Sequence, residues 1–323
     1  MYSRRDLLLY TLAGVASTHL ARADNPAGPG PRAGHAMAWH AGRRAICLLG
    51  GDRVGLPSAV PAEDVWTWDG RHWLRADTSG AGPQAASLVA AAGDPDRGSV
   101  LAYGGFRIEG PQKYGAPAGE LWELDRGLAW RRHDALGPGP RHHHAMAFDT
   151  KRGRLVVYGG IDATGDWPTD VWEWDRSRWQ RVESATGPGP RAHHALAFDS
   201  RRARVVLRGG TTPGKVQPPD TWEWDGRNWH RSADDGPLPG GGYRMAYDAA
   251  REVTVLCGGD TCLWDGRAWT RLATTTSPAS RLVHAMAYDP NRRVVVLYGG
   301  SVERVNAADT WEWNGTTWAQ PRG

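Results

Sequence analysis

The chain has 323 residues, of which 42 are glycine, 22 are proline, 18 are tryptophan and only 3 are phenylalanine. This length allows one or two domains with a sizeable core, and 40% hydrophobic with 23% charged residues excludes wholesale disorder. Abundant glycine and proline without a collagen period favour many turns and short strands. Three cysteines are too few for a disulfide-rich scaffold.

The formal net charge of +4 does not indicate a nucleic-acid-binding protein. Two of these charges come from residues 1–23, where Arg4, Arg5 and Arg22 outnumber Asp6. The rest of the chain holds the other 36 of 39 basic residues and 34 of 35 acidic residues, with no run of like charge. We therefore expect no nucleic-acid partner.

Residues 1–23 resemble a twin-arginine export signal through Ser3-Arg4-Arg5-Asp6-Leu7. The apolar stretch from Leu7 to Ala16 would span roughly 15 Å as a helix, about half of a bilayer core. Ala21-Arg22-Ala23 is typical of a cleavage site, which predicts a mature chain that begins at Asp24. The resemblance implies a bacterial protein that is periplasmic or secreted and has no membrane attachment after cleavage.

A pattern recurs six times between residues 31 and 320, after a Gly/Pro-rich linker at 24–30. Each copy has two β-type runs, a double glycine that ends the second run, a third run with alternating tryptophan, and a further tryptophan that opens a fourth. Four short strands cannot bury their faces alone, whereas six such units arranged radially can. The double glycines are Gly50-Gly51, Gly104-Gly105, Gly159-Gly160, Gly209-Gly210, Gly258-Gly259 and Gly299-Gly300.

These copies resemble the Kelch repeat family in their Pro-Arg-x-x-His-Ala motif, double glycine, aspartate before the third strand and fourth-strand tryptophan. The resemblance implies an all-β fold, a six-bladed Kelch-like β-propeller with four antiparallel strands per blade. Because all four strands of a blade are contiguous in sequence, we expect the ring to close by packing of blade one against blade six. Blade two has no such motif between Gln84 and Gly93, and blade five has Gly240-Gly241-Gly242-Tyr243-Arg244 in its place.

Sixteen of the 18 tryptophans fall in third and fourth strands. Residues i and i+2 of a strand share a face, so these side chains are expected to pack between neighbouring blades rather than to stack sugars. Of the other two, Trp39 lies in a first strand. Trp167 lies in a loop of blade three and is a candidate ligand contact.

Loops between second and third strands emerge on one face and are long in every blade except blade five, which predicts a lopsided funnel as the binding site. The repeat itself places arginine and histidine beside this funnel. Arg32, Arg141, Arg191 and Arg281 occupy the Pro-Arg position, and His35, His144, His194 and His284 occupy the histidine position. Departures from the repeat are His142, His143, His193, Tyr243 and Arg244.

Two functional interpretations and one neutral interpretation follow from these residues. Arginine with protonatable histidine favours a carboxylate or an acidic sugar. Neutral imidazoles from two blades would instead hold a divalent metal, but no carboxylate or thiolate accompanies them in sequence. A histidine-rich rim without a ligand is the third alternative. We predict no cofactor, and a small-molecule or protein ligand at the propeller mouth.

The resemblance also brings enzymes into question. Six-bladed exported Kelch proteins include sialic-acid mutarotases, so an epimerase or mutarotase acting on acidic sugars is the alternative to a binding module. No catalytic glutamate is evident, although Glu109, Glu120 and Glu303 lie in or beside the rim loops. A galactose oxidase-like copper enzyme is less favoured, because the cysteines lie within strands and away from the expected mouth.

Cys257 and Cys262 flank the short segment Gly-Gly-Asp-Thr between two expected strands. Their spacing predicts a cross-strand disulfide formed after export. The alternative is a pair of separate buried thiols.

Overall fold

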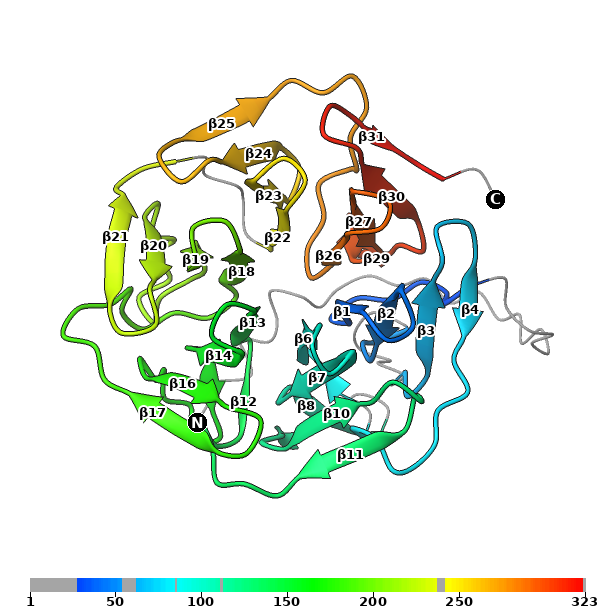
Figure 1. Ribbon diagram of the computed structural model, residues 1–323, viewed down its shortest axis with the longest axis horizontal. Coiled ribbons are helices and arrows are strands. Elements are labelled where there is room, and N and C mark those ends of the chain that lie inside the picture. The colour runs from blue at the N-terminus through cyan, green and yellow to red at the C-terminus, as the bar shows by residue number, and fades with distance from the viewer. Residues whose placement is uncertain (1–27, 54–61, 85, 111–112, 237–241, 322–323) are drawn as a thin grey trace.

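The computed structural model describes residues 28–53, 62–84, 86–110, 113–236 and 242–321. The predicted export signal and most of the predicted linker lie outside these residues. Six four-stranded antiparallel sheets stand around a common centre and form a six-bladed β-propeller, as the sequence predicted (Figure 1). In the described part of the chain, no helix has the length and apolar character needed to cross a membrane.

The strands of each blade follow one another in the sequence. Blade one has β1 (Ala36–His40), β2 (Ala45–Leu49), β3 (Val65–Trp68) and β4 (Trp73–Arg75), and blade two has β6 (Ala90–Asp94), β7 (Ser99–Tyr103), β10 (Leu121–Leu124) and β11 (Trp130–His133). Blade three has β13 (Ala145–Asp149), β14 (Arg154–Tyr158), β16 (Val171–Trp174) and β17 (Trp179–Val182), and blade four has β18 (Ala195–Asp199), β19 (Arg204–Arg208), β20 (Thr221–Trp224) and β21 (Trp229–Ala233). Blade five has β22 (Arg244–Asp248), β23 (Val253–Cys257), β24 (Thr261–Trp264) and β25 (Trp269–Leu272), and blade six has β26 (Ala285–Asp289), β27 (Val294–Tyr298), β30 (Thr310–Trp313) and β31 (Trp318–Ala319).

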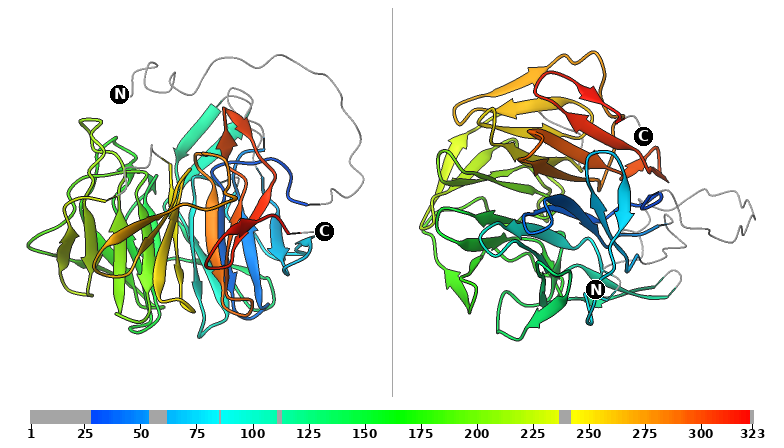
Figure 2. Two further views of the ribbon diagram at one scale, coloured as in Figure 1. Left: turned by 90° about the horizontal axis from the view of Figure 1, so that it is seen from above. Right: turned by 45° about the vertical axis from the view of Figure 1, so that its right-hand side comes forward.

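Short strands decorate the loops that join second to third strands. A three-stranded sheet of β5 (Ala86–Ser87), β8 (Phe106–Gly110) and β9 (Lys113–Pro117) extends blade two. Smaller pairs are β12 (Arg141–His142) with β15 (Ile161–Asp162), and β28 (Ser301–Val302) with β29 (Val305–Asn306). The β8–β9 hairpin projects beyond the blades in the side view (Figure 2), whereas only three residues separate β23 from β24 in blade five. The loop face is therefore uneven, as expected.

The core lies between blades. Successive strand residues point to opposite sheet faces. In β14, Leu155 and Val157 therefore pack with residues of blade two, while Val156 and Tyr158 pack with residues of blade four. Third- and fourth-strand tryptophans fill these layers in pairs, such as Trp174 and Trp179, whose ring centroids are 5.6 Å apart. Packing between blades thus accounts for most of the tryptophan content.

Blade one closes the ring by packing against blade six, which confirms the predicted closure. The indole Nε1 of Trp68 donates to Glu312 Oε1 at 2.9 Å, and that of Trp73 donates to Thr310 Oγ1 at 2.9 Å. Within the ring, Trp224 makes the same bond to Glu173 at 2.8 Å. The closing interface therefore repeats the contacts of an interior one.

The predicted disulfide between Cys257 and Cys262 is wrong. The thiols are free, and β23 pairs with β24 so that Cys257 lies opposite Thr261 while Cys262 lies opposite Leu256. Neighbouring register positions face opposite sides of the sheet, so Cys257 packs with blade six and Cys262 with blade four. Burial raises the pKa of each thiol to about 11.

Because the closing interface repeats an interior one, we expect the same substitution to destabilise the protein equally at the blade one–blade six seam and inside the ring. Trp68→Phe and Trp224→Phe each remove one indole donor, and each leaves a carboxylate, Glu312 or Glu173, with one hydrogen bond fewer. We expect each to lower the free energy of unfolding by about 1–3 kcal/mol, within error of each other. Urea denaturation measures this, and a seam variant with wild-type stability would contradict ring closure through this contact.

Candidate functional site

The arginines of the Pro-Arg position are buried and form hydrogen bonds and ion pairs within their own blades. Arg191 donates from Nη1 to Gly209 O at 3.1 Å and to Asp220 Oδ1 at 3.0 Å, and from Nη2 to Pro188 O. Its side chain is only 1% exposed. Arg32, Arg141 and Arg281 are buried in the same way against Asp64, Asp170 and Asp309. The ligand-binding role predicted for Arg141, Arg191 and Arg281 is thereby corrected, because their guanidinium groups are committed within the blade.

The histidines of the repeat position are also structural. His144 and His194 are buried and meet Tyr103 and Tyr158 edge-on, with ring centroids 5.5 and 5.7 Å apart. Burial, followed by the neighbouring arginine charge, lowers the pKa of His144 to about 3, so the ring is uncharged at neutral pH. His35 and His284 are equally buried. The predicted ligand contacts of His144, His194 and His284 are therefore not available at the surface.

These rings explain the double glycine. At Gly159 a Cβ would stand 2.8 Å from Cε1 of His194, and at Gly160 it would stand 2.8 Å from Cβ of His144. Both glycines have positive φ, which a side chain would further disfavour. In blade five Tyr243 replaces the histidine, and its buried hydroxyl accepts a hydrogen bond from Gly210 N at 3.0 Å. Tyr243 is therefore structural as well.

In every blade, the residue before the repeat's histidine position has a left-handed backbone conformation. The six residues are Gly34, Leu88, His143, His193, Gly242 and Val283, with φ between 49° and 92°. Backbone bonds link several of them around the centre: Val283 O accepts from Gly34 N at 2.8 Å, and His143 O accepts from His193 N at 2.9 Å. A non-glycine residue held in a sparsely populated backbone region costs roughly 1–3 kcal/mol, and such residues cluster at functional sites.

Arg244, His143 and His193 meet at the centre of the ring. The two imidazole centroids are 3.9 Å apart. All three side chains remain partly accessible although they lie deep in the protein. Arg244 stands at the start of β22, where each of the other blades has alanine, and within the described chain its guanidinium donates to Tyr243 O at 3.1 Å. Among the described residues, no aspartate or glutamate lies within ion-pair distance of it.

The electrostatics of this cluster follow from burial around one cation. Burial lowers the pKa of Arg244 to about 10, so the guanidinium stays charged at neutral pH. Burial and then the Arg244 charge lower the pKa of His193 to about 4. The pKa of His143 is held well below its usual range by burial and by the adjacent His193 and His142 rings. The centre therefore presents uncharged imidazoles beside one positive charge.

Two further predicted residues have different outcomes. His142 joins the cluster: it stacks on Phe106 with centroids 3.9 Å apart, and its Nδ1 lies against Nδ1 of His143. Trp167 is half-buried in its loop and makes no ring contact with this cluster. Within the ranges that the structure covers, no three His, Cys, Asp or Glu side chains are arranged to hold a metal ion.

The comparisons with known proteins establish the fold but no activity. No family model matches the chain. Serine/threonine-protein phosphatase BSL2 of Arabidopsis thaliana is 31% identical over 137 residues, which are 41% of this chain and 13% of that protein. A solved structure described as "Structure of YjhT" superposes with a TM-score of 0.69 at 11% identity and covers 92% of this chain and 99% of that one. This likeness shows a shared propeller fold.

A structural role for the Pro-Arg arginines predicts a stability loss. Arg191→Ala leaves Asp220 buried without its counter-ion, so we expect unfolding to become easier by about 3–5 kcal/mol. Arg178→Ala is the matched control, because Arg178 is 71% exposed and should change stability by no more than ~0.5 kcal/mol. Chemical denaturation compares them, and an Arg191→Ala protein of wild-type stability would restore the ligand-binding interpretation.

Proposed function

We propose that the protein is a binding module for a small carboxylate-bearing ligand such as an acidic sugar. Arg244 would bind the carboxylate. The observation that carries this proposal is a guanidinium at the centre of the ring with no acidic partner in the described chain. A buried charge without a counter-ion is costly. An anion bound at the centre would pair with the Arg244 guanidinium and offset the free-energy cost of burying its charge.

The groups around Arg244 suit an acidic sugar. A guanidinium presents a planar set of donors that matches a carboxylate in a bidentate arrangement. Each neutral imidazole has one donor and one acceptor nitrogen, the pair that a sugar hydroxyl needs. His143 and His193 supply these groups beside the cation. An exported location, proposed from residues 1–23, would bring the protein into contact with extracellular acidic sugars.

Removal of the central charge tests the proposal. Arg244→Gln should weaken binding of sialic or uronic acids at least tenfold, because a charge-assisted hydrogen bond is worth about 1.5–3 kcal/mol. Arg71→Gln is the control, since Arg71 is exposed and outside the site. Calorimetric titration gives both affinities. The proposal fails if no acidic sugar binds the folded wild-type protein, or if Arg244→Gln binds as tightly as wild type.

The pH dependence of this binding identifies the charged group. The pKa of His193 is about 4 and that of Arg244 is about 10, so neither changes charge between pH 7 and pH 8.5. Affinity should therefore be flat across this range. A tenfold fall per pH unit would instead mean that a protonated histidine holds the anion.

A second candidate is an epimerase or mutarotase acting on the same ligands. Two uncharged imidazoles in contact beside a carboxylate anchor are suited to moving a proton to and from a sugar oxygen. His143→Asn and His193→Asn keep a residue type that tolerates the left-handed backbone. If this activity exists, each should slow anomer exchange of sialic acid about 100-fold, measured by exchange NMR, while Arg244-dependent binding persists. If wild-type protein exchanges the anomers of sialic acid no faster than buffer does, the enzyme alternative is excluded and the protein is a binding module only.

A further inference from the structure

Blade two contains a cavity where four other blades place a buried arginine. The cavity has a volume of about 250 Å³, and its lining includes Pro83, Gly104, Glu120 and Trp122. Position 86, the counterpart of the arginine position, holds alanine. The backbone register supports this equivalence, because Ala86 pairs with Arg107 as Arg141 pairs with Asp162, each two residues beyond a double glycine.

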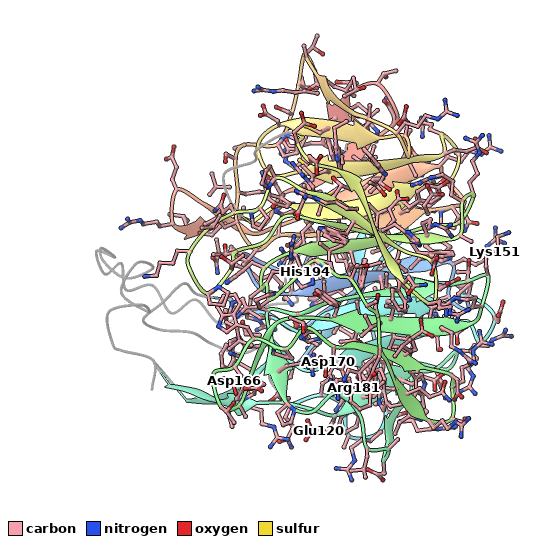
Figure 3. The ribbon with its side chains drawn as sticks, turned by 90° about the vertical axis from the view of Figure 1, so that its left-hand side faces the viewer. Glu120, Lys151, Asp166, Asp170, Arg181 and His194 are labelled. Atoms are coloured by element: carbon pink, nitrogen blue, oxygen red, sulfur yellow. The ribbon has the colours of Figure 1, made fainter. Side chains whose placement is uncertain are left out.

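The three acceptors of a buried arginine recur around this cavity. Arg141 donates to a proline carbonyl three residues earlier, to a glycine carbonyl 18 residues later, and to Asp170. Relative to position 86, Pro83 and Gly104 have the same two spacings. Glu120 precedes Trp122 by two residues, as Asp170 precedes Trp172. Figure 3 labels Glu120 and Asp170, which supply the carboxylates in blades two and three.

Blade one shows that this carboxylate position serves two guanidinium groups at once. Asp64 pairs through Oδ1 with Arg32, whose side chain is fully buried, and through Oδ2 with Arg53, whose side chain is 45% exposed. Arg107 is the counterpart of Arg53, since both lie two residues after a double glycine. It pairs with Glu120 and is 48% exposed. Blade two therefore keeps the outer cation, whereas its sequence lacks the inner one.

We propose that this cavity is a binding site for a guanidinium group on a slender aliphatic chain. Free arginine-like compounds and an arginine side chain of another polypeptide share this chemistry. The volume lies below the range of about 300–1,000 Å³ that is usual for drug-sized ligands, and it suits a single side chain. The Trp122 ring lines the cavity and offers a guanidinium an aromatic contact. A planar fork also suits a carboxylate and carbonyl acceptors better than an ammonium group does.

Two basic residues line the cavity and do not outweigh Glu120. Arg107 and Arg132 are 48% and 52% exposed, so solvent screens their charges. Arg132 is also paired with Asp134 at 2.7 Å. The proposal is independent of the anion site at Arg244, which has the opposite ligand charge.

Calorimetric titration of the full-length protein with agmatine and putrescine is the test. The two probes share a four-carbon diamine skeleton, and only agmatine carries a guanidinium. We expect agmatine to bind at least tenfold more tightly than putrescine. A short peptide with one arginine, compared with its lysine version, distinguishes a polypeptide source from a free small molecule. If neither agmatine nor the arginine peptide binds, the proposal is overturned.

Three variants connect binding to the cavity. Ala86→Arg supplies the inner side chain, so it should raise the thermal unfolding midpoint and abolish agmatine binding. Glu120→Gln keeps the shape of the side chain and should weaken binding at least tenfold. Arg107→Gln removes only the outer cation and should bind agmatine as tightly as wild type or more tightly. An Ala86→Arg protein that binds agmatine like wild type overturns the proposal, while Arg244→Gln should leave agmatine binding unchanged.

Discussion

The architecture of each regular blade depends on one buried ion pair. Arg191 ties three separate segments together: the approach to the first strand at Pro188, the end of the second strand at Gly209, and the start of the third strand at Asp220. Removal of the arginine or the aspartate would leave the other charge buried without a counter-ion, so the two residues must occur together. Proline–arginine, double glycine and aspartate are thus parts of one local structure, which explains why they recur as a set.

Because each regular blade pairs its buried arginine with its own aspartate, a charge without such a partner is found where a blade departs from the repeat. Blade five has Arg244 where the other first strands begin with alanine, and this change places a cation at the centre of the ring. Blade two has alanine at position 86, and among the described residues Glu120 forms its ion pair with an exposed arginine, Arg107. One departure adds a charge and the other removes one, so the two proposed sites would favour ligands of opposite sign.

The sequence predicted the propeller because its information is local and repeated six times: alternating tryptophans, a turn and a double glycine. It did not predict which arginines were committed, because the acceptors of Arg141 lie 18 and 29 residues away and burial decides the pairing. The disulfide prediction failed on register. An offset of one position puts Cys257 and Cys262 on opposite sheet faces, and spacing alone does not reveal such an offset. The sequence did not predict the cavity of blade two, because its origin becomes clear only when position 86 is compared with the buried arginines of the other blades.

The central imidazoles are held in place by the ring and not by local preference. Gly34 and Gly242 adopt the same left-handed backbone in blades one and five without a side chain, so the fold itself does not call for histidine there. His143 and His193 take up this conformation at an energetic cost, and the hydrogen bond from His193 N to His143 O helps to maintain it. Packing of the blades supplies the free energy that holds both residues in this conformation, where the charge of Arg244 acts on both rings. The anion site proposed at Arg244 would give this cluster a role that the fold itself does not require.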